Sequence, residues 1–250
     1  MTAALSTRAL SKSFGGFAAN SGIDFTLERG ARHALIGPNG AGKTTFVNLL
    51  TGVHPPTSGE VFLEEERVTH LSQHERVKRG LTRTFQINTL FPGLTVLESI
   101  VLAIGERKGS THVWHQPVTR QRETIEEARE LLGRLSLTED AGRVTRWLSY
   151  GKQRLVEIAL ALATRPRVLV LDEPAAGIPS HTSAELFGVL ERLPRDMSIL
   201  LIEHDMDLVF RFAERITVFA NGSVLADGAP AEVAADRRVR EVYLGESDHG

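Results

Sequence analysis

The sequence of 250 residues predicts an α/β fold built on a mostly parallel sheet. Beyond residue 165, short apolar runs alternate with segments of helical periodicity, which is the order of parallel strands joined by helical crossovers. Before them, residues 95–164 have helical periodicity throughout and indicate an inserted helical part. A hydrophobic content of 42% and a charged content of 24% are enough to form a buried core, which excludes a disordered chain.

The N-terminal part is expected to hold short strands, a glycine-rich turn and one helix. Residues 23–27 alternate with period two, and Ala34-Leu35-Ile36 is an apolar run that enters the turn. Residues 44–50 continue as a helix, which Gly52 and the prolines after it end. Residues 58–68 alternate again and predict a small hairpin at the edge of solvent.

The helical part contains two clear amphipathic patterns. Val96, Ile100 and Ile104 recur at helical spacing, as do the apolar residues of segment 125–135. The charged residues of this second segment alternate in sign on the face opposite its leucines, which is typical of a solvated face and less so of a docking surface. Residues 105–117 have no sustained period and are expected to be an exposed connection.

The C-terminal part alternates between strands and helices. The expected strands are residues 168–171, 198–202 and 216–219, and the expected helices are residues 182–193 and 206–214. We therefore expect one domain over residues 1–250, with a core and β region at residues 1–86 and 165–250 and a helical subdomain at residues 87–164.

Composition limits the function further. The 29 basic residues are balanced by 31 acidic ones, so no overall positive field is available to bind nucleic acid. The chain has no cysteine, which excludes disulfides and thiolate metal sites and suits a reducing compartment. The N-terminus lacks a secretory signal, and the apolar runs are too short to span a bilayer. Work at a membrane would therefore need another chain to cross it.

Histidines at two places have spacings that could share a metal ion. His70 and His74 are four residues apart, and His112 and His115 are three apart. The sequence shows no third ligand for either pair, so we expect all four side chains to be solvated.

The segment Gly37–Thr44 fits the phosphate-loop pattern G-x-x-x-x-G-K-[ST]. It follows a predicted strand and precedes a predicted helix, which is the context that the loop requires. Its glycines allow backbone N–H groups to converge on phosphate oxygens. Lys43 can reach the β- and γ-phosphates, and the Thr44 hydroxyl can ligate Mg²⁺.

A second half-site follows at residues 168–173, where four apolar residues end in Asp172 and Glu173. The run predicts a buried parallel strand that ends in acid. In phosphoryl transfer, one carboxylate at such a strand end helps to hold Mg²⁺, while a neighbouring one can orient or deprotonate the attacking water. We assign the first role to Asp172 and the second to Glu173.

Three more segments make the pattern specific: Arg83-Thr84-Phe85-Gln86, Leu148-Ser149-Tyr150-Gly151-Lys152-Gln153-Arg154 and Ile202-Glu203-His204-Asp205. With them the chain resembles the ATP-binding subunits of ABC transporters from Phe14 to Gly245, and the second segment resembles the ABC signature. The resemblance implies a nucleotide-binding domain of the P-loop NTPase class. Such a domain has a mostly parallel core sheet, a small N-terminal antiparallel β region and an inserted helical subdomain.

The resemblance also implies roles for single residues. Phe14 would stack on adenine, Gln86 would contact Mg²⁺ and the attacking water, and His204 would contact the γ-phosphate. Ser149 and Gly151 would bind the γ-phosphate of ATP held by the other protomer of a nucleotide-sandwich dimer. Taken singly, Phe14 could belong to the core and Ser149 could be an ordinary helix cap. The implied ATP contacts are Phe14, Gly37, Pro38, Asn39, Gly40, Ala41, Gly42, Lys43, Thr44 and Thr45, the implied catalytic residues are Glu173, His204, Gln86 and Lys43, and the implied Mg²⁺ ligands are Thr44, Gln86 and Asp172.

Two positions depart from the family pattern. Lys152 stands where the signature often has glutamine, and Pro179 stands where an aspartate or asparagine is usual in the D-loop. Proline has neither an N–H group nor a polar side chain, so a contact across the dimer is in doubt there. The catalytic groups are intact, so we expect altered coupling or rate and not inactivity.

Within the family, the chain most resembles the branched-chain and hydrophobic amino acid uptake group, through residues 83–86, 174–177 and 201–206. The resemblance implies ATP and Mg²⁺ as ligands, and a bacterial importer with two permeases, a second ATP-binding subunit, which makes a homo- or heterodimer, and a periplasmic binding protein. The subunit would sit at the cytoplasmic face of the inner membrane. Residues 87–98, with Leu90 and Phe91, would line a groove for a permease helix, or else belong to the core of the helical part.

Other functions stay open. A lipopolysaccharide-export type ATPase shares the compact length and the Tyr-Leu-Gly ending. ABC ATPases that act on nucleic acid carry long coiled coils or zinc modules, for which this chain has neither the length between its motifs nor cysteines. Translation factors of the family carry two cassettes, and this chain has one. A purely regulatory nucleotide-binding domain would not need a base such as Glu173.

Overall fold

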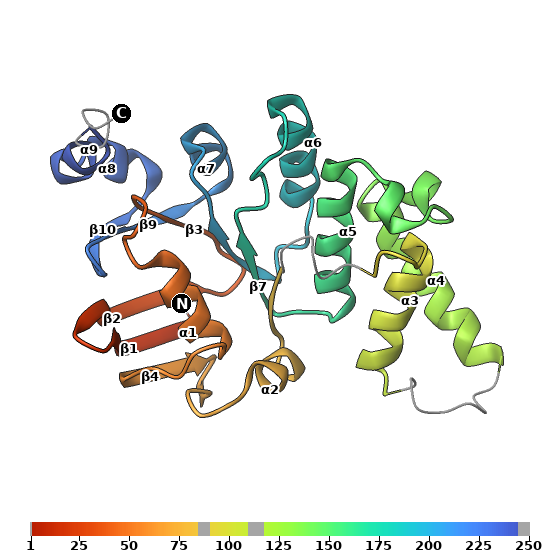
Figure 1. The fold of residues 1–250 in the computed structure, drawn as a ribbon, viewed down its shortest axis with the longest axis horizontal. Helices are drawn as coiled ribbons and strands as arrows, with labels where there is room; N and C mark the ends of the chain where they lie inside the picture. Colours follow the sequence, from red (N-terminus) through yellow and green to blue (C-terminus); the bar gives the residue numbers. More distant parts are fainter. Residues whose placement is uncertain (1, 85–90, 110–117, 245–250) are drawn as a thin grey trace. The chain divides into compact units, whose positions relative to one another are not determined.

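The computed structural model describes residues 2–84, 91–109 and 118–244. The chain divides into two compact units. The first, here called the core unit, comprises residues 1–82, 167–174 and 194–250, and the second, the helical unit, comprises residues 83–166 and 175–193. Figure 1 labels most of their helices and strands. Within the described residues, every helix falls short of the length and apolarity that a bilayer span requires.

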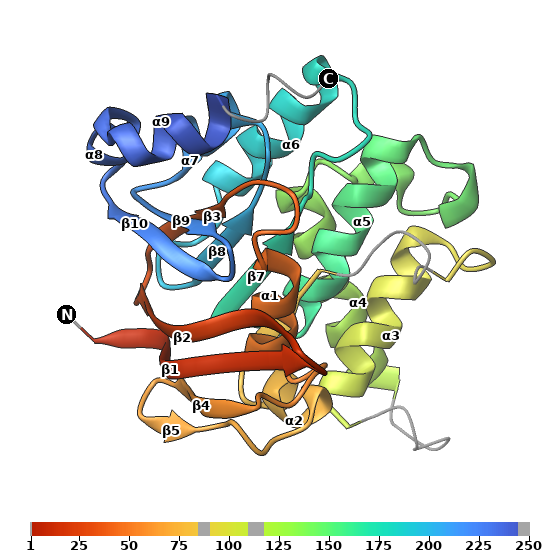
Figure 2. The same ribbon diagram turned by 60° about the vertical axis from the view of Figure 1, so that its left-hand side comes forward.

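An antiparallel sheet forms one layer of the core unit (Figure 2). Its four strands are, in spatial order, β2 (Phe17–Glu28), β1 (Ala3–Phe14), β4 (Ser58–Leu63) and β5 (Glu66–Arg67). The predicted strand at 23–27 and the predicted hairpin at 58–68 are confirmed as parts of it. Strand β1 was not predicted, because register shifts and the positive φ of Ala9 interrupt its alternation of apolar residues.

The second sheet is mostly parallel, as predicted. Its six strands are, in spatial order, β10 (Ser223–Gly228), β9 (Arg215–Ala220), β3 (Arg32–Ile36), β8 (Ser198–Ile202), β7 (Val168–Asp172) and β6 (Leu81–Arg83). Strands β9, β3, β8 and β7 run parallel, and β10 pairs antiparallel with β9. The parallel strands place their carboxyl ends at one edge of the sheet, which is where ligands bind in such folds.

Helices pack on both faces of the parallel sheet in the core unit. The helices of the core unit are α1 (Lys43–Thr51), α2 (Gln73–Lys78), α7 (Met206–Phe212), α8 (Pro230–Ala235) and α9 (Arg237–Leu244). Alternate residues of β3 face opposite layers: Leu35 belongs to an apolar cluster with Phe46 of α1, and Ile36 to a cluster with Val209 of α7. The predicted helix at 206–214 ends earlier, because Ala213 takes an extended conformation.

The helical unit contains α3 (Val96–Arg107), α4 (Val118–Arg134), α5 (Tyr150–Ala163) and α6 (Ser180–Glu191). The helices predicted within residues 95–164 are confirmed, and α6, which was predicted as a helix of the C-terminal part, groups with them in this unit. Thr95 and Glu98 form a reciprocal capping box at the start of α3. This helix runs to Arg107, so the connection expected from residue 105 begins later. The reason is that Arg107 donates hydrogen bonds to the Ala163 carbonyl (2.7 Å) and to Glu127 (2.7 Å), which hold the last turn.

A buried arginine caps the C-terminal end of α1. Arg76 of α2 is 1% exposed, and its guanidinium donates hydrogen bonds to the carbonyls of Leu49 (2.7 Å) and Leu50 (2.6 Å). It also donates to the carbonyls of Leu71 and Thr69. Burial lowers the pKa of Arg76 to about 10, so the group stays charged at neutral pH. A cation at this place stabilises the negative end of the helix dipole and satisfies carbonyls that the helix itself leaves unpaired.

We predict that Arg76→Met lowers the free energy of unfolding by about 3 kcal/mol, because buried carbonyls lose their donor. Urea unfolding followed by circular dichroism measures the loss. Arg79→Met is the matched control, since Arg79 ends the same helix but pairs with Glu66 at the surface (2.8 Å). The control should cost less than about 1 kcal/mol. Equal losses in the two variants would contradict the capping role.

Candidate nucleotide-binding site

The predicted phosphate loop lies between β3 and α1. Gly42 precedes the helix with a left-handed backbone (φ 96°), and Gly40 also has a positive φ (76°). A Cβ atom at Gly37 would lie 2.3 Å from the carbonyl oxygen of Phe219, so only glycine lets the loop pass this close to β9. The first N–H groups of α1 are therefore presented at the end of the loop, where the helix dipole favours an anion.

Lys43 brings a positive charge into this loop. Its Nζ atom donates hydrogen bonds to the carbonyls of Gly37 (2.5 Å) and Pro38 (2.9 Å), and the side chain is buried. The ammonium is thus held by the loop's own backbone at the start of α1. Thr44, Asn39 and Gly40 are exposed beside it. This arrangement suits the binding of a polyphosphate.

Two other segments clamp the phosphate loop from behind. Asn20 of β2 donates a hydrogen bond from its amide to the carbonyl of Gly42 (3.2 Å), and the N–H of Gly222 donates to the carbonyl of Ala41 (3.1 Å). Cβ atoms at Gly42 and Gly222 would lie 2.5 and 2.7 Å from the carbonyl oxygen of Ala19. The loop is therefore in close backbone contact with β2 and with the turn between β9 and β10.

The predicted carboxylate pair stands at the carboxyl end of β7. Asp172 is the last residue of the strand, and Glu173 follows with a positive φ of 47°. The N–H of Glu173 donates to the carbonyl of Ile202 in the neighbouring β8 (2.9 Å). A left-handed backbone at a non-glycine residue is strained, and such residues are concentrated at functional sites.

His204 meets Glu173 at this edge. Its Nε2 atom lies 2.6 Å from Oε1 of Glu173, and both side chains are open to solvent. Glu203, which is buried, accepts a hydrogen bond from the N–H of His204 (3.0 Å) and so fixes the backbone at the end of β8. The structure therefore brings together an acid and an imidazole predicted from separate segments. The phosphate loop follows β3, so it leaves from the same edge of the sheet.

Phe14 is at the end of β1, and its ring is 48% exposed, which excludes the alternative of a core residue. The ring contacts His54 edge-on, with 5.9 Å between the ring centroids. The Nζ atom of Lys12 lies 5.1 Å from the Phe14 ring centroid. An exposed flat ring of this kind can stack on a planar base.

Ser149 and Gly151 lie at the N-terminal end of α5 in the helical unit. Ser149 is the N-cap residue, but its side chain makes no capping hydrogen bond, so the alternative of an ordinary helix cap is not met. A Cβ at Gly151 would lie 2.4 Å from the Cγ2 atom of Thr182. These two residues line a pocket of about 420 Å³ together with Lys152 and Arg192. The N-terminus of α5, with the uncommitted Ser149 hydroxyl beside it, suits an anionic ligand.

The structure shows the contacts of Lys152 and Pro179, the two residues that depart from the family pattern. Lys152 donates a hydrogen bond to Oδ2 of Asp140 (2.6 Å), and Asp140 is 2% exposed and also pairs with Arg143. Pro179 is the N-cap residue of α6, and its carbonyl accepts from the N–H of Thr182 (2.9 Å). Lys152 therefore ties the signature segment to a buried carboxylate, whereas Pro179 makes no side-chain cap and joins α6 only through its backbone carbonyl.

Several predicted residues fall elsewhere. Gln86, Leu90, His112 and His115 lie outside the described residues. Phe91 is 49% exposed and so is not in the core of the helical unit. His70 and His74 are exposed, and among the described residues no cluster of three or more His, Cys, Asp or Glu side chains could hold a metal ion.

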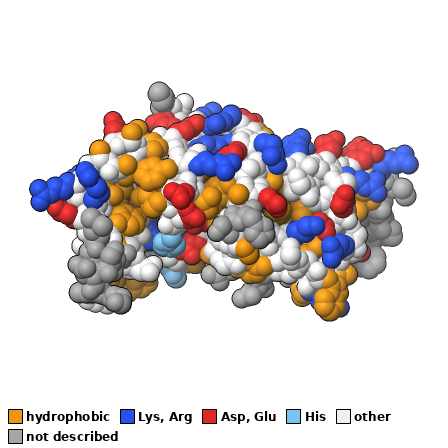
Figure 3. Space-filling view, turned by 90° about the horizontal axis from the view of Figure 1, so that it is seen from above, with side chains coloured by type: hydrophobic (Ala, Val, Ile, Leu, Met, Phe, Trp, Pro, Cys, Tyr) orange, Lys and Arg blue, Asp and Glu red, His pale blue; other side chains and the backbone are white. Residues whose placement is uncertain are grey.

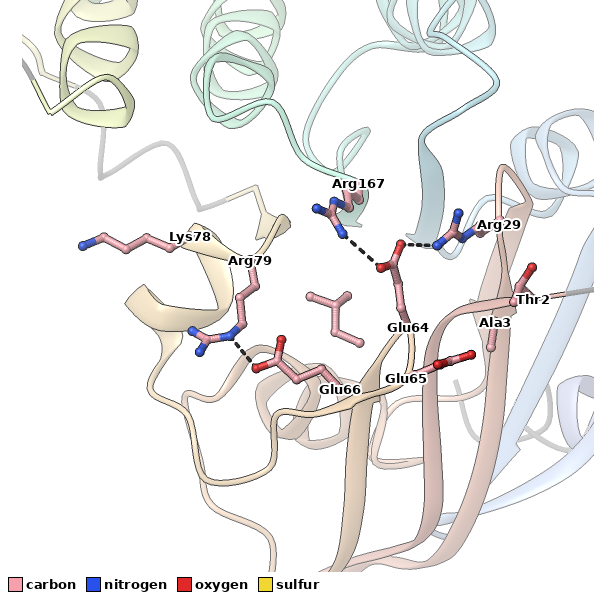
Figure 4. Close-up of a pocket in the computed structure, with 10 residues that line it drawn as sticks. Thr2, Ala3, Arg29, Glu64, Glu65, Glu66, Lys78, Arg79 and Arg167 are labelled. Carbon is pink, nitrogen blue, oxygen red and sulfur yellow. Dashed lines mark hydrogen bonds and ion pairs between the residues drawn. The ribbon is translucent and has the colours of Figure 1, made fainter.

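A pocket of the core unit lies at the other edge of the parallel sheet (Figure 4). It has a volume of about 540 Å³ and charged walls. Glu64 accepts hydrogen bonds from Arg29 (2.6 Å) and Arg167 (3.0 Å), and Arg79 pairs with Glu66 (2.8 Å). Arg167 precedes β7, whereas Asp172 ends it, so this pocket and the carboxylate pair are at opposite ends of the strand. The exposed ion pairs account for the charged walls of this pocket, so we do not assign it as a nucleotide site.

Sequence reasoning missed four residues that shape the site: Asn20, Arg76, Glu203 and Gly222. Asn20 and Arg76 carry no motif, and their partners are distant in the sequence. A polar side chain inside a strand or a helix face that is otherwise apolar would have been the available signal. Glu203 was visible only as an acid that follows an apolar run.

Comparisons with known proteins agree with this geometry. A family model described as "ABC transporter" matches residues 20–176, and one described as "Branched-chain amino acid ATP-binding cassette transporter" matches residues 223–249. The high-affinity branched-chain amino acid transport ATP-binding protein BraF of Pseudomonas aeruginosa is 38% identical, over 97% of this chain and 98% of that protein. LivG of Escherichia coli, which carries the same functional description, is 38% identical over the same shares.

Solved structures are similar over the whole chain. The ADP conformation of MJ1267, an ATP-binding cassette of an ABC transporter, has a TM-score of 0.84 and 32% identity, with 98% of this chain and 99% of that chain covered. A dimeric post-hydrolysis state of the cassette MJ0796, bound to ADP and Pi, has a TM-score of 0.75 and 26% identity. It covers 90% of this chain and 98% of that one.

We predict that Asn20→Ala raises the KM for ATP about fivefold, because the Gly42 carbonyl loses a hydrogen bond worth about 1 kcal/mol and the loop loosens. Steady-state ATP hydrolysis measures the change. Ser21→Ala is the control, since Ser21 is the exposed neighbour on β2. An unchanged KM in Asn20→Ala, with an unchanged unfolding midpoint, would show that the clamp does not position the loop.

Proposed function

Because the chain belongs to the ATP-binding cassette family of ABC transporters, we propose that it powers a bacterial importer of branched-chain or other hydrophobic amino acids. The chain is an ABC ATPase. The observation that carries the import proposal is the end-to-end similarity to BraF and LivG, together with the branched-chain family match at residues 223–249. We further propose that the core and helical units act together as one ATP-binding domain.

The core unit supplies the groups that bind ATP. Backbone N–H groups of the phosphate loop and the ammonium of Lys43 surround the β- and γ-phosphates, and Phe14 stacks on adenine. The Thr44 hydroxyl and the Asp172 carboxylate are hard oxygen donors of the kind that Mg²⁺ prefers, and Gln86 is the third proposed ligand. When bound, Mg²⁺ would neutralise negative charge on the phosphates.

Glu173 acts as the base in this proposal. The carboxylate takes a proton from the water that attacks the γ-phosphorus while the bond to the ADP oxygen breaks, and the 2.6 Å contact with Nε2 of His204 orients the carboxylate. His204 also contacts the γ-phosphate, so one imidazole connects the base to the group that is transferred. Glu203 holds the backbone of His204 in place (3.0 Å). Hydrolysis therefore depends on the neighbouring ends of β7 and β8.

Two copies complete two sites. Ser149 and Gly151 of one copy contact the γ-phosphate held by the phosphate loop of the other, with the α5 N-terminus facing that charge. The dimeric state of the MJ0796 cassette supports this arrangement. The second copy is either an identical chain or a related ATP-binding subunit. ATP then joins the two copies, and its hydrolysis separates them.

The dimer does its work through membrane partners. We propose two permease subunits, fed by a periplasmic binding protein, with this chain as a peripheral subunit at the cytoplasmic face of the inner membrane. The exposed Phe91 would contact a permease helix. The cargo is bound by the permeases and the binding protein, because the ATPase does not contact it.

The rival functions have weaker support. The family match at residues 223–249 and the relatives described above carry branched-chain amino acid transport descriptions, which favour import over lipopolysaccharide export. On the face shown in Figure 3, Lys and Arg side chains are interspersed with Asp and Glu side chains. Among the residues coloured there, no continuous basic surface is offered to a nucleic acid backbone.

We predict that Glu173→Gln lowers kcat for ATP hydrolysis at least about 100-fold while ATP binding is retained, because only proton removal is lost. A coupled phosphate-release assay gives kcat, and fluorescent nucleotide titration gives the affinity. Glu130→Gln, an exposed carboxylate on α4, is the control. Turnover by Glu173→Gln at the wild-type rate would refute the assignment of the base.

The transport proposal is tested by recovery of partners. A tagged chain purified from native membranes should bring down two permeases and a second ATP-binding subunit, identified by mass spectrometry. Phe91→Glu should reduce permease recovery and leave ATP binding intact, because a charge is placed on the apolar contact. Recovery of lipid-export components, or of no membrane protein, would contradict the importer while leaving the ATPase assignment in place.

A further inference from the structure

An exposed tryptophan precedes the signature helix. Trp147 ends the 3₁₀ turn Thr145–Trp147 and is 66% exposed to solvent. The guanidinium carbon of Arg146 lies 5.0 Å from the Trp147 ring centroid, which is a cation–π contact. The turn leads directly into Leu148 and then to Ser149, the N-cap residue of α5.

The backbone under this tryptophan is held firmly. The N–H and the hydroxyl of Thr145 both donate a hydrogen bond to the carbonyl oxygen of Leu94, and the donor–acceptor distance is 3.0 Å in each case. Thr145 and Leu148, on either side, are buried. The exposure of Trp147 is therefore not that of a loose loop. A large aromatic side chain that is exposed to water on a firmly held backbone, with an arginine beside it, has the character of a binding hot spot.

The core unit presents a complementary ring. Phe14 is half exposed, with His54 at its edge and the Lys12 ammonium 5.1 Å from its centroid. A base that stacks on Phe14 keeps its second face open unless another side chain covers it. An aromatic ring is the group best suited to cover that face.

We propose that Trp147 of one copy stacks on the adenine that Phe14 of the second copy holds, so that two aromatic rings enclose the base. The inference rests on the proposed function, in which Ser149 contacts the γ-phosphate of that same ATP. Trp147 precedes Ser149 by two residues, and Leu148 between them is extended (φ −76°, ψ 153°). That spacing covers about 7 Å, and the indole extends it, so one segment can contact both ends of one nucleotide.

The partner of this surface is therefore a nucleotide-loaded second copy. Stacking reads the face of a base and not its edge, so purine bases should be accepted alike. Arg146 adds a positive charge next to the same ring, close to where a nucleotide would lie. The base would then contribute to the contact between copies, in addition to the γ-phosphate.

Kinetics test the contact. Trp147→Ala should raise the KM for ATP about tenfold and leave kcat within about twofold, because stacking is equal in the ground state and in the transition state. Trp147→Phe should restore most of the affinity. Leu102→Ala, an exposed apolar residue of the same unit, is the control and should change neither constant. Inorganic tripolyphosphate, which has no base, should inhibit wild type and Trp147→Ala with the same constant.

Fluorescence tests the geometry. The chain has two tryptophans, so Trp114→Phe leaves Trp147 as the sole emitter. In a Glu173→Gln background, which keeps ATP bound, Mg-ATP should lower iodide quenching of Trp147 at least about threefold. The change should follow dimer formation measured by analytical ultracentrifugation.

The outcomes separate the two proposals. If an ATP-dependent dimer forms but Trp147 stays accessible to iodide and Trp147→Ala leaves the KM unchanged, the stacking proposal is wrong and the nucleotide-sandwich dimer stands. If Trp147→Ala weakens the binding of tripolyphosphate as much as the binding of ATP, the Trp147 side chain acts on the phosphates and the proposal is also wrong. If no ATP-dependent dimer forms, the dimer of the proposed function is refuted, and the stacking proposal with it.

Discussion

Close contact between three backbone segments holds the nucleotide-binding part of the molecule together. The phosphate loop passes so near to β2 and to the turn between β9 and β10 that Cβ atoms at Gly42 and Gly222 would meet the Ala19 carbonyl at 2.5 and 2.7 Å. Only glycine permits this approach. The contact joins the antiparallel sheet, the parallel sheet and the start of α1. The conformation of the loop is therefore a property of the whole core unit and not of the motif alone.

Helix α1, which continues the phosphate loop, is held by hydrogen bonds at both of its ends. Its first turn continues the phosphate loop, where Lys43 is bonded to the Gly37 carbonyl (2.5 Å). Its last carbonyls accept from the buried guanidinium of Arg76. A fixed positive charge at the C-terminal end of α1 stabilises the helix dipole, whose positive end lies at the phosphate loop. Preorganised dipoles need no rearrangement when a charged ligand arrives.

The pairing of Glu173 with His204 follows from parallel strand order. Strands β7 and β8 are neighbours, so the residues after them, Glu173 and His204, come within hydrogen-bond distance (2.6 Å) although 31 positions separate them. In the helical unit, a hydrogen bond between side chains likewise holds the signature segment, because Lys152 donates to the buried Asp140. This ion pair gives a structural reason for the lysine that replaces the usual glutamine. Pro179 occupies the N-cap position of α6 without a side-chain cap, and no contact in the structure explains the proline there.

The sequence by itself determined the phosphate loop, the strand–acid motif, the order of most strands and helices, and the family. These depend on spacing along the chain, which folding does not alter. Only the tertiary structure revealed β1 as a strand, the clamp by Asn20 and Gly222, the cap by Arg76 and the partner of Lys152. Each of these depends on groups that are distant in sequence or hidden by irregular register, and no local periodicity marks them. The exposure of Trp147 belongs with them, because burial depends on which neighbours the fold provides.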